Sequence, residues 1–277
     1  MSDRNSPIGI LDSGIGGFSV VRQVQRLLPN EDLIYFGDGA NVPYGNHTAQ
    51  TIVDMSRYML EFMQQHKVKV LLVACNTISC IIDQCADAVS CPIFNTVQAG
   101  ADGVAALDVE RVGVISTVFT HNTRIYPRMI QAGGQKNIRV LSCGCPDLAR
   151  LVEHNLGHIS GMVQMERELE QALRPMVDQE QIQCCVLGCT HYSLISEEIR
   201  CLYPALPLVD PAQEMARALR EYLEREDLTN QEREQGTLSI YTTGDTEEYV
   251  LRAKQVGLEQ ITGVSYYPPK RDLKNER

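Results

Sequence analysis

A regular alternation of short apolar runs with longer amphipathic segments is the feature of this sequence that most limits its possible folds. The apolar runs have the composition of strands buried on both faces, and they are Ile8–Leu11, Leu33–Phe36, Val70–Ala74, Pro92–Asn95, Val112–Ile115, Ile138–Leu141, Cys184–Leu187, Leu206–Val209 and Leu238–Tyr241. The segments between them carry helical periodicity and are long enough to be crossovers: Gly17–Leu28, Thr48–His66, Thr77–Ala88, Thr120–Ala132, Pro146–Asn155, Ser160–Val177, Ser193–Cys201 and Glu214–Glu226. This order predicts an α/β fold with mostly parallel sheets that helices cover.

The size and composition of the chain indicate a folded protein of one large or two compact units. It has 277 residues, of which 44% are hydrophobic and 22% charged, unlike disordered, collagen-like or coiled-coil sequences. Lys and Arg total 25 against 35 Asp and Glu, so the formal net charge is −10. Because such a chain repels phosphate backbones and anionic lipid, we expect no nucleic-acid and no membrane partner.

The start of the chain and its cysteines favour a cytoplasmic protein. Met1–Pro7 is polar and lacks the apolar segment of a signal peptide, and no later apolar run approaches the roughly 20 residues of a membrane-spanning helix. The ten cysteines would suggest disulfides in a short secreted chain. In a long cytosolic one, free thiols are expected.

Three short motifs of the first half of the chain recur in the same order in the second half. The pairs are Gly9–Ser13 with Gly113–Thr117, Val73–Thr77 with Leu187–His191, and Pro92–Asn95 with Pro207–Asp210. A repeated order predicts two similar α/β halves, although short apolar strands also resemble one another by chance.

The repeat places Cys75 and Cys189 at equivalent positions, each at the carboxyl end of a strand and just before a helix. Ligands of α/β sheets bind at that edge. A helix N-terminus favours the thiolate, so each sulfur is expected to titrate near neutral pH. The alternative is that both are small core residues, as isolated buried cysteines usually are.

Polar residues follow both cysteines. Asn76 and Thr77 follow the first, and Thr190 and His191 follow the second. Their hydrogen bonds suit a carboxylate or a developing enolate. His191 is either a capping or structural histidine or a proton-transfer partner of Cys189. The pattern is typical of a pair of acid and base thiols.

The glycine-rich loop Asp12–Gly17 follows the first strand and opens a helix. It lacks dinucleotide-binding spacing, because Ser19 stands where the third glycine belongs and Asp12 would repel a pyrophosphate. Two interpretations stay open. Asp12 either caps the helix in a tight turn or belongs to a loop that binds a small substrate.

A four-thiolate zinc site from Cys143, Cys145, Cys184 and Cys185 has the wrong spacing. Structural zinc usually takes cysteine pairs two to four residues apart, and adjacent cysteines on a strand point to opposite faces. We therefore expect no metal site.

The motifs together resemble a known family. In order and spacing they are similar to those of the glutamate racemases of the aspartate/glutamate racemase superfamily, and they are Asp12–Gly17, Tyr35–Asp38, Val42–Gly45, Ala74–Thr77 and Leu187–Tyr192. The resemblance runs from Ile8 to Asp210, and Ile240–Leu258 resembles the closing strand and helix. It implies a fold of two α/β domains with the active site in the cleft between them, residues 1–97 with 210–277 forming the first and residues 98–209 the second.

The resemblance also implies an activity. It is that of an isomerase that interconverts L- and D-glutamate without a cofactor and supplies D-glutamate for peptidoglycan. One cysteine thiolate removes the α-proton and the other cysteine, as thiol, returns a proton to the opposite face. Cys75 and Cys189 fall on these positions, Asp12 and His191 on the groups that assist them, and Glu153, like Asp38, on a family acidic residue of less certain role.

The substrate contacts implied by the resemblance are Asp12, Ser13, Pro43, Tyr44, Gly45, Cys75, Asn76, Thr77, Thr117, Thr120, Cys189, Thr190 and His191. A homodimer is expected. The alternatives are an aspartate or broader-specificity amino-acid racemase and a non-catalytic amino-acid-binding protein, which would have lost one of the thiols.

Overall fold

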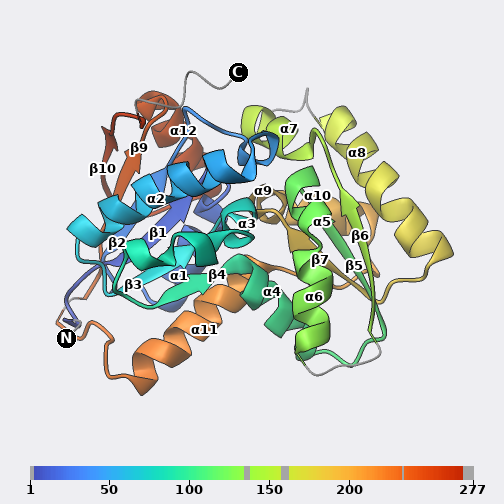
Figure 1. Ribbon diagram of the computed structural model, residues 1–277, viewed down its shortest axis with the longest axis horizontal. Coiled ribbons are helices and arrows are strands. Elements are labelled where there is room, and N and C mark those ends of the chain that lie inside the picture. The colour runs from blue at the N-terminus through green and yellow to red at the C-terminus, as the bar shows by residue number, and fades with distance from the viewer. Residues whose placement is uncertain (1–2, 134–137, 157–161, 233, 271–277) are drawn as a thin grey trace.

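The chain forms two parallel β-sheets that lie side by side, each with helices on both faces (Figure 1). The computed structural model describes residues 3–133, 138–156, 162–232 and 234–270. Within these residues the strands are β1 (Ile8–Asp12), β2 (Leu33–Gly37), β3 (Val70–Val73), β4 (Ile93–Asn95), β5 (Arg111–Ser116), β6 (Arg139–Gly144), β7 (Cys184–Gly188), β8 (Leu208–Val209), β9 (Leu238–Thr242) and β10 (Ile261–Tyr266). Every strand pairing in this part of the chain is parallel, which confirms the predicted α/β fold.

The two sheets repeat one topology. The first has the order β10-β9-β2-β1-β3-β4 and the second the order β6-β5-β7-β8. The order β2-β1-β3-β4 therefore matches the whole second sheet, and the repeated sequence motifs fall on the matching pairs β1 and β5, β3 and β7, and β4 and β8. The predicted pair of similar halves is confirmed, with β9 and β10 added to the first.

Helices fill the connections between the strands. They are α1 (Phe18–Leu27), α2 (Ala49–Gln65), α3 (Asn76–Ser79), α4 (Thr96–Ala105), α5 (Val118–Thr123), α6 (Ile125–Ala132), α7 (Leu148–Asn155), α8 (Met162–Arg174), α9 (Thr190–Leu194), α10 (Ser196–Leu202), α11 (Pro211–Arg225) and α12 (Thr246–Val256). On the first sheet α1, α11 and α12 pack on one face and α2 and α3 on the other. On the second sheet α4 and α6 pack on one face and α7 to α10 on the other.

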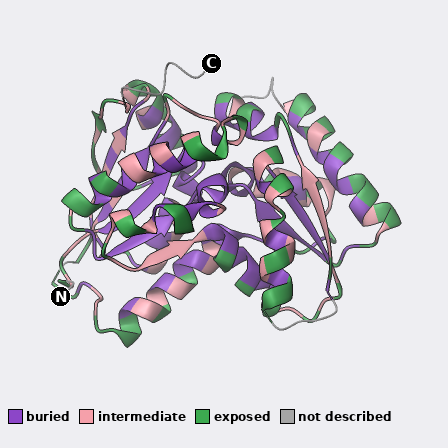
Figure 2. Cartoon of the chain, in the orientation of Figure 1, coloured by how far each residue is buried: buried purple, intermediate pink, exposed green. Residues whose placement is uncertain are grey.

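The strands are buried on both faces, as parallel strands between helices must be. In β1, Ile8 and Ile10 enter one core of the first sheet and Leu11 enters the other, which is the period of two of extended chain. Figure 2 shows buried strands between helices whose outer faces are exposed. None of the helices in the described ranges has the length and apolar character needed to cross a membrane.

Two helices connect the sheets. α4 follows β4 of the first sheet, yet its Val104 packs in a core of the second sheet. α11 follows β8 of the second sheet, and its Leu219 packs in a core of the first. This crossing is consistent with the division into residues 1–97 with 210–277 and residues 98–209, whose bounds stay a prediction.

The prediction of one α-helix over Thr77–Ala88 is wrong, although the buried face is where that prediction put it. Ile78, Ile81, Ile82 and Cys85 are buried at helical spacing. However, α3 is a single turn, and afterwards N–H groups bond three residues back, as from Ile81 to Ile78 and from Cys85 to Ile82. Apolar periodicity places the buried face but does not distinguish an α-helix from successive 3₁₀ turns.

Other expected helices are divided. Thr120–Ala132 is interrupted at Arg124, whose φ of 54° lies in the left-handed region, and Ser193–Cys201 is interrupted between α9 and α10 at Ile195. The first two residues of the expected helix Ser160–Val177 lie outside the described residues. Neither α4 nor β10 was predicted.

Candidate active site

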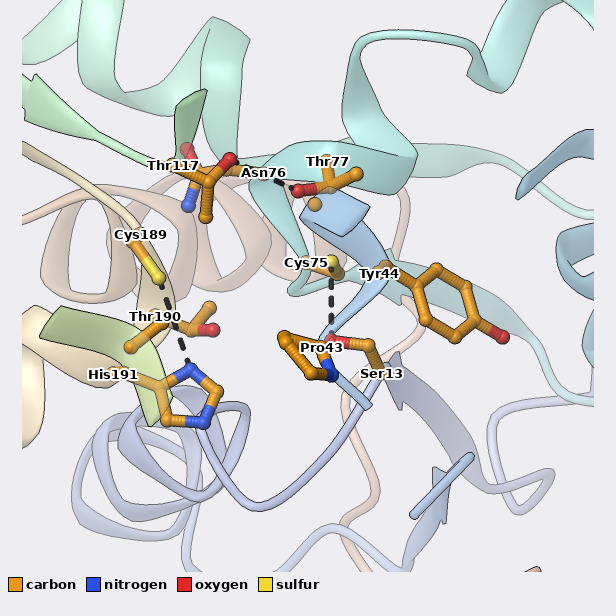
Figure 3. A pocket seen from close by; sticks show the side chains of 12 residues that line it. Ser13, Pro43, Tyr44, Cys75, Asn76, Thr77, Thr117, Cys189, Thr190 and His191 are labelled. Carbon is orange, nitrogen blue, oxygen red and sulfur yellow. Dashed lines mark hydrogen bonds between the residues drawn. The ribbon is translucent and has the colours of Figure 1, made fainter. Parts of the chain in front are cut away.

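Strand ends from both sheets meet at one small cavity. Cys75 follows β3 and Cys189 follows the equivalent strand β7, and Figure 3 shows the two thiols on opposite sides of the space between them. The carboxyl ends of parallel strands are where α/β sheets bind ligands. The cavity is lined by Ser13, Pro43, Tyr44, Gly45, Cys75, Asn76, Thr77, Thr117, Ala149, Cys189, Thr190 and His191.

The cavity is narrow in this conformation. Its free volume is about 20 Å³, close to the space of one water molecule. A second cavity of about 200 Å³ adjoins it, and Pro43, Ala149 and His191 form the wall between the two. Because any amino acid is several times larger than water, a ligand enters the first cavity only when its walls, which come from both sheets, separate.

Cys75 is buried, and its thiol donates a hydrogen bond to Ser13 Oγ at 3.6 Å. The expectation that this sulfur titrates near neutral pH is wrong. Burial, and next the carboxylate of Asp12, raise the pKa of Cys75 to about 12, although the backbone N–H of Ile78 and the Ser13 hydroxyl act in the opposite direction. α3 has only four residues, so its terminus does not offset desolvation. The raised pKa keeps Cys75 as a thiol at neutral pH.

Cys189 faces the cavity beside a histidine. Its Sγ lies 3.7 Å from His191 Nδ1, and His191 Nε2 forms a short hydrogen bond with Glu153 Oε2. Burial alone lowers the pKa of His191, but the charge of Glu153 and the hydrogen bonds to Cys189 and Glu153 outweigh it and raise that pKa well above its usual value. A protonated imidazole is thus held next to the Cys189 sulfur.

Asp12 lies behind the cavity wall and does not cap a helix. Its Oδ2 accepts the N–H of Gly14 at 3.0 Å, and its Oδ1 accepts the hydroxyl of Thr190 at 3.3 Å. α1 begins after Gly17 without a side-chain cap. The bond to Thr190 joins the end of β1 to the start of α9. Of the two interpretations left open for Asp12, the structure excludes the one in which its side chain caps α1.

Asn76 presents an unpaired donor at the cavity. Its Oδ1 accepts the hydroxyl of Tyr126 at 2.6 Å, whereas its buried Nδ2 has no hydrogen-bond partner among the described residues. An unsatisfied buried amide is costly unless a ligand accepts from it. Nearby, the Thr77 and Thr117 hydroxyls lie 3.3 Å apart and link the two halves (Figure 3).

The loop that carries Pro43, Tyr44 and Gly45 is held by Asp38. The Tyr44 hydroxyl donates to Asp38 Oδ2 at 2.5 Å, and Thr243 donates to Oδ1 at 2.5 Å. Asp38 is buried at the end of β2. It therefore fixes a wall of the cavity without lining it.

Not every residue expected to contact substrate lines the cavity. Thr120 is buried and accepts a hydrogen bond from the Thr117 hydroxyl at 3.1 Å. Like Asp12, it does not line the cavity but contacts a residue that does. Glu153 lines only the adjoining cavity. Sequence reasoning missed Ala149, which lines the cavity from α7, and Tyr126. A small residue and a tyrosine on helices carry no motif that would have revealed them.

The chain is similar to known racemases. A family model described as Asp/Glu/Hydantoin racemase matches residues 8–219. The glutamate racemase of Syntrophus aciditrophicus is 38% identical over 262 residues, which cover 94% of this chain and 93% of the relative. The crystal structure of the glutamate racemase isoform RacE1 from Bacillus anthracis is 28% identical, with a TM-score of 0.85 and coverage of 96% and 98%. That of the Francisella tularensis glutamate racemase in complex with D-glutamate is 31% identical, with a TM-score of 0.84 and coverage of 97% and 99%.

The fold of two similar α/β halves and these matches define an isomerase of the racemase class. The chain belongs to the Asp/Glu/Hydantoin racemase family.

Proposed function

We propose that this enzyme interconverts L- and D-glutamate by proton transfer between two cysteines, Cys75 and Cys189, without a cofactor. The observation that carries the proposal is the position of the two thiols, at equivalent strand ends and on opposite sides of one cavity. A substrate α-carbon between them exposes one face to each sulfur. Two groups on opposite faces invert a stereocentre without rotation of the intermediate.

The groups beside the two sulfurs suggest a first step. Protonated His191 lies 3.7 Å from the Cys189 sulfur and attracts negative charge there, whereas burial and Asp12 keep Cys75 as a thiol. Cys189 then removes the α-proton, and Cys75 donates its proton to the opposite face. The product leaves an enzyme with the proton on the other sulfur, which is the form that acts on the other enantiomer.

The carbanion needs stabilisation by fixed groups in a dry site. The unpaired amide of Asn76 supplies a donor at the cavity, and the Thr77 hydroxyl lies at the same wall. Asp12 and Glu153 are proposed to set the protonation of the sulfurs indirectly, because Asp12 bonds Thr190 and Glu153 bonds His191. Closure of the two halves excludes water.

Glutamate is the proposed substrate because the relatives and solved structures similar over nearly the whole chain are named glutamate racemases. Aspartate is the nearest rival. The D-glutamate would supply peptidoglycan synthesis, as the family resemblance implies. The expected homodimer stays a prediction, which sedimentation of the purified protein tests.

Incubation of the purified chain with L-glutamate, L-aspartate or a neutral amino acid, without added cofactor, tests the proposal by chiral chromatography. We expect D-glutamate to form fastest. Conversion of none of the three would contradict racemase function and favour an amino-acid-binding protein, and preferential conversion of aspartate would overturn the proposed substrate.

Variants in deuterated water test the mechanism. Cys75→Ala and Cys189→Ala are each expected to lose racemisation by at least about 10²- to 10⁴-fold. Cys85→Ala, the control at a buried cysteine outside the cavity, should lose mainly stability. Early product should carry deuterium at the α-carbon while recovered substrate carries little. Retention of the substrate's own proton in the first product would show that one base acts alone.

A further inference from the structure

A pocket in the second half of the chain lies apart from both cavities described above. It is lined by His121, Asn122, Arg124, Pro127, Val140 and Ser142, and none of these residues lines either cavity at the thiols. Its free volume is about 340 Å³, which is the size of a site for a small organic molecule. We call it the α5–β6 pocket.

The α5–β6 pocket lies where α5, the start of α6 and β6 pack together (Figure 1). Val140 and Ser142 are two residues apart on β6 and therefore point to the same face of the sheet. α5 approaches that face closely, because a Cβ at Gly144 would lie 3.1 Å from the Cβ of His121. The glycine therefore allows α5 to bring His121 against the strand.

The polar side chains at the pocket include several hydrogen-bond donors. The imidazole of His121 is held by Ser142, whose Oγ lies 2.9 Å from Nδ1, and this contact does not use the other ring nitrogen. The exposed Arg124 and Asn122 add guanidinium and amide N–H groups. None of the described residues that line the pocket is acidic, although the chain as a whole carries a net charge of −10. The pocket is thus a positively charged site on an acidic protein.

The backbone of Arg124 does not account for an arginine at this position. Its φ of 54° and ψ of 28° lie in the left-handed region, which glycine and asparagine adopt more readily than other residues. The turn between α5 and α6 would therefore form more easily with either of those residues. What arginine adds at this turn is a guanidinium at the pocket.

The donors of the pocket suit an oxyanion. A guanidinium and an imidazole N–H bind the oxygen atoms of phosphate and carboxylate groups through charge-assisted hydrogen bonds. Pro127 and Val140 form an apolar part of the wall, which can contact the organic part of a ligand. The pocket therefore fits a small organic anion.

The pocket is connected to the thiol cavity through α5 and α6. α5 begins after Thr117, whose hydroxyl lies 3.3 Å from that of Thr77 in the first half. Tyr126 in the first turn of α6 donates to Asn76 Oδ1. An anion in the pocket contacts α5 and the residue that joins it to α6, and so holds both helices in the present arrangement. In this arrangement the cavity is too small for an amino acid.

We propose that the α5–β6 pocket is a regulatory site for a small organic anion, whose phosphate or carboxylate group binds Arg124 and His121. The bound anion stabilises the arrangement of α5 and α6 in which the cavity is narrow, and it therefore weakens the binding of substrate. The regulation rests on the proposed racemase function, whereas the binding of the anion does not.

Calorimetric titration of the purified chain with phenyl phosphate, benzoate and benzyl alcohol tests the binding. The three probes carry the same ring, and the first two distinguish phosphate from carboxylate as the preferred group. We expect at least one anion to bind roughly tenfold more tightly than the neutral alcohol. Binding of the alcohol as tightly as of both anions, or no binding of either anion, would overturn the proposal.

Two arginine variants test the position of the bound anion. Arg124→Asn removes the guanidinium but keeps a residue that accepts the left-handed backbone, so it should fold and bind the anion roughly tenfold more weakly. Arg128→Gln removes the same charge at an exposed position one helical turn away and outside the pocket. It should change the affinity by less than about twofold. Equal losses in both variants would show general charge attraction and no site.

Racemisation kinetics test the regulation. With the tighter-binding anion at saturation, the KM of the wild type for glutamate should rise roughly fivefold, and that of Arg124→Asn should stay nearly constant. An unchanged KM in the wild type would overturn the regulation, and an equal rise in Arg124→Asn would show that the anion competes inside the cavity. Absence of any racemisation would overturn the proposed function and with it the regulation, whereas the anion site is decided by calorimetry alone.

Discussion

At the residue scale, the carboxylate of Asp12 is wholly buried beside the cavity. Burial raises its pKa above the usual value, although the charge of His191 and the N–H groups of Gly14 and Gly17 oppose this. Because the folded pKa exceeds the unfolded one, the ionised carboxylate destabilises the fold above the unfolded pKa. This penalty is complete above the folded pKa, shrinks as the pH falls through it, and is gone below the unfolded pKa.

Asp12→Asn should therefore raise the melting temperature at pH 7 to 8 and lower the racemisation rate by about 10²-fold. In a chain of this size, each kcal/mol added to the free energy of unfolding raises the melting temperature by about 2–4 °C. Calorimetry of both proteins between pH 4 and pH 8 measures the difference, which should shrink as the pH falls. A variant that is less stable than the wild type at pH 8 would show that the carboxylate contributes more through its hydrogen bonds than burial costs.

Tyr126 acts on the cavity through Asn76. The Tyr126 hydroxyl donates a hydrogen bond to the amide oxygen of Asn76, so that the amide nitrogen is oriented to donate to a ligand in the cavity. Tyr126→Phe should cost about 1 kcal/mol of binding, a roughly fivefold rise in KM, with a smaller change in kcat. Tyr266→Phe, at an exposed position, is the control. Equal KM values for the two variants would show that Tyr126 does not position the Asn76 amide for substrate.

At the scale of elements, α4 shows why local propensity misleads. Gly100 and Gly103 make this segment a poor helix by itself, and it was not predicted. In the fold, a Cβ at Gly100 would lie 2.9 Å from the Tyr126 ring and 3.1 Å from Pro211. The glycine lets α4 approach α6 and α11, and this packing stabilises the helix.

Gly100→Ala should therefore destabilise the protein, although alanine favours helix. Overpacking costs about 1–3 kcal/mol, against a gain of about 1 kcal/mol in propensity. Gly133→Ala, whose new Cβ would have no neighbour closer than 3.5 Å, should stay within about 0.5 kcal/mol. Thermal unfolding measures both. If the two variants are equally stable, α4 tolerates a wider spacing than the structure shows.

At the scale of the whole molecule, Arg252 joins the two halves on the side of α7 and α12. From α12 of the first half, its guanidinium donates to Leu156 O at 2.7 Å and His154 O at 3.1 Å, at the carboxyl end of α7 in the second half. The side chain is buried. α7 also carries Glu153, so this contact ties the halves together near the His191 pair.

Arg252→Ala should lower the free energy of unfolding by about 1.5–3 kcal/mol, because it removes charged hydrogen bonds from a buried guanidinium to two main-chain carbonyls. Glu248→Ala removes only a half-exposed ion-pair partner 3.6 Å from Arg252 and should cost less than about 1 kcal/mol. Urea titration compares them. An Arg252→Ala loss no larger than that of Glu248→Ala would mean that other contacts hold the halves.

The sequence alone determined the parallel α/β class, the repeat of two halves and the positions of Cys75 and Cys189 at strand ends, because burial period, turn residues and strand-to-helix junctions are local properties. Only the tertiary structure decided the rest. It raised the pKa of Cys75 through desolvation and paired His191 of α9 with Glu153 of α7. It also placed Thr120 outside the cavity lining and made α4 a helix. Each of these depends on groups distant in the chain whose proximity no local pattern encodes.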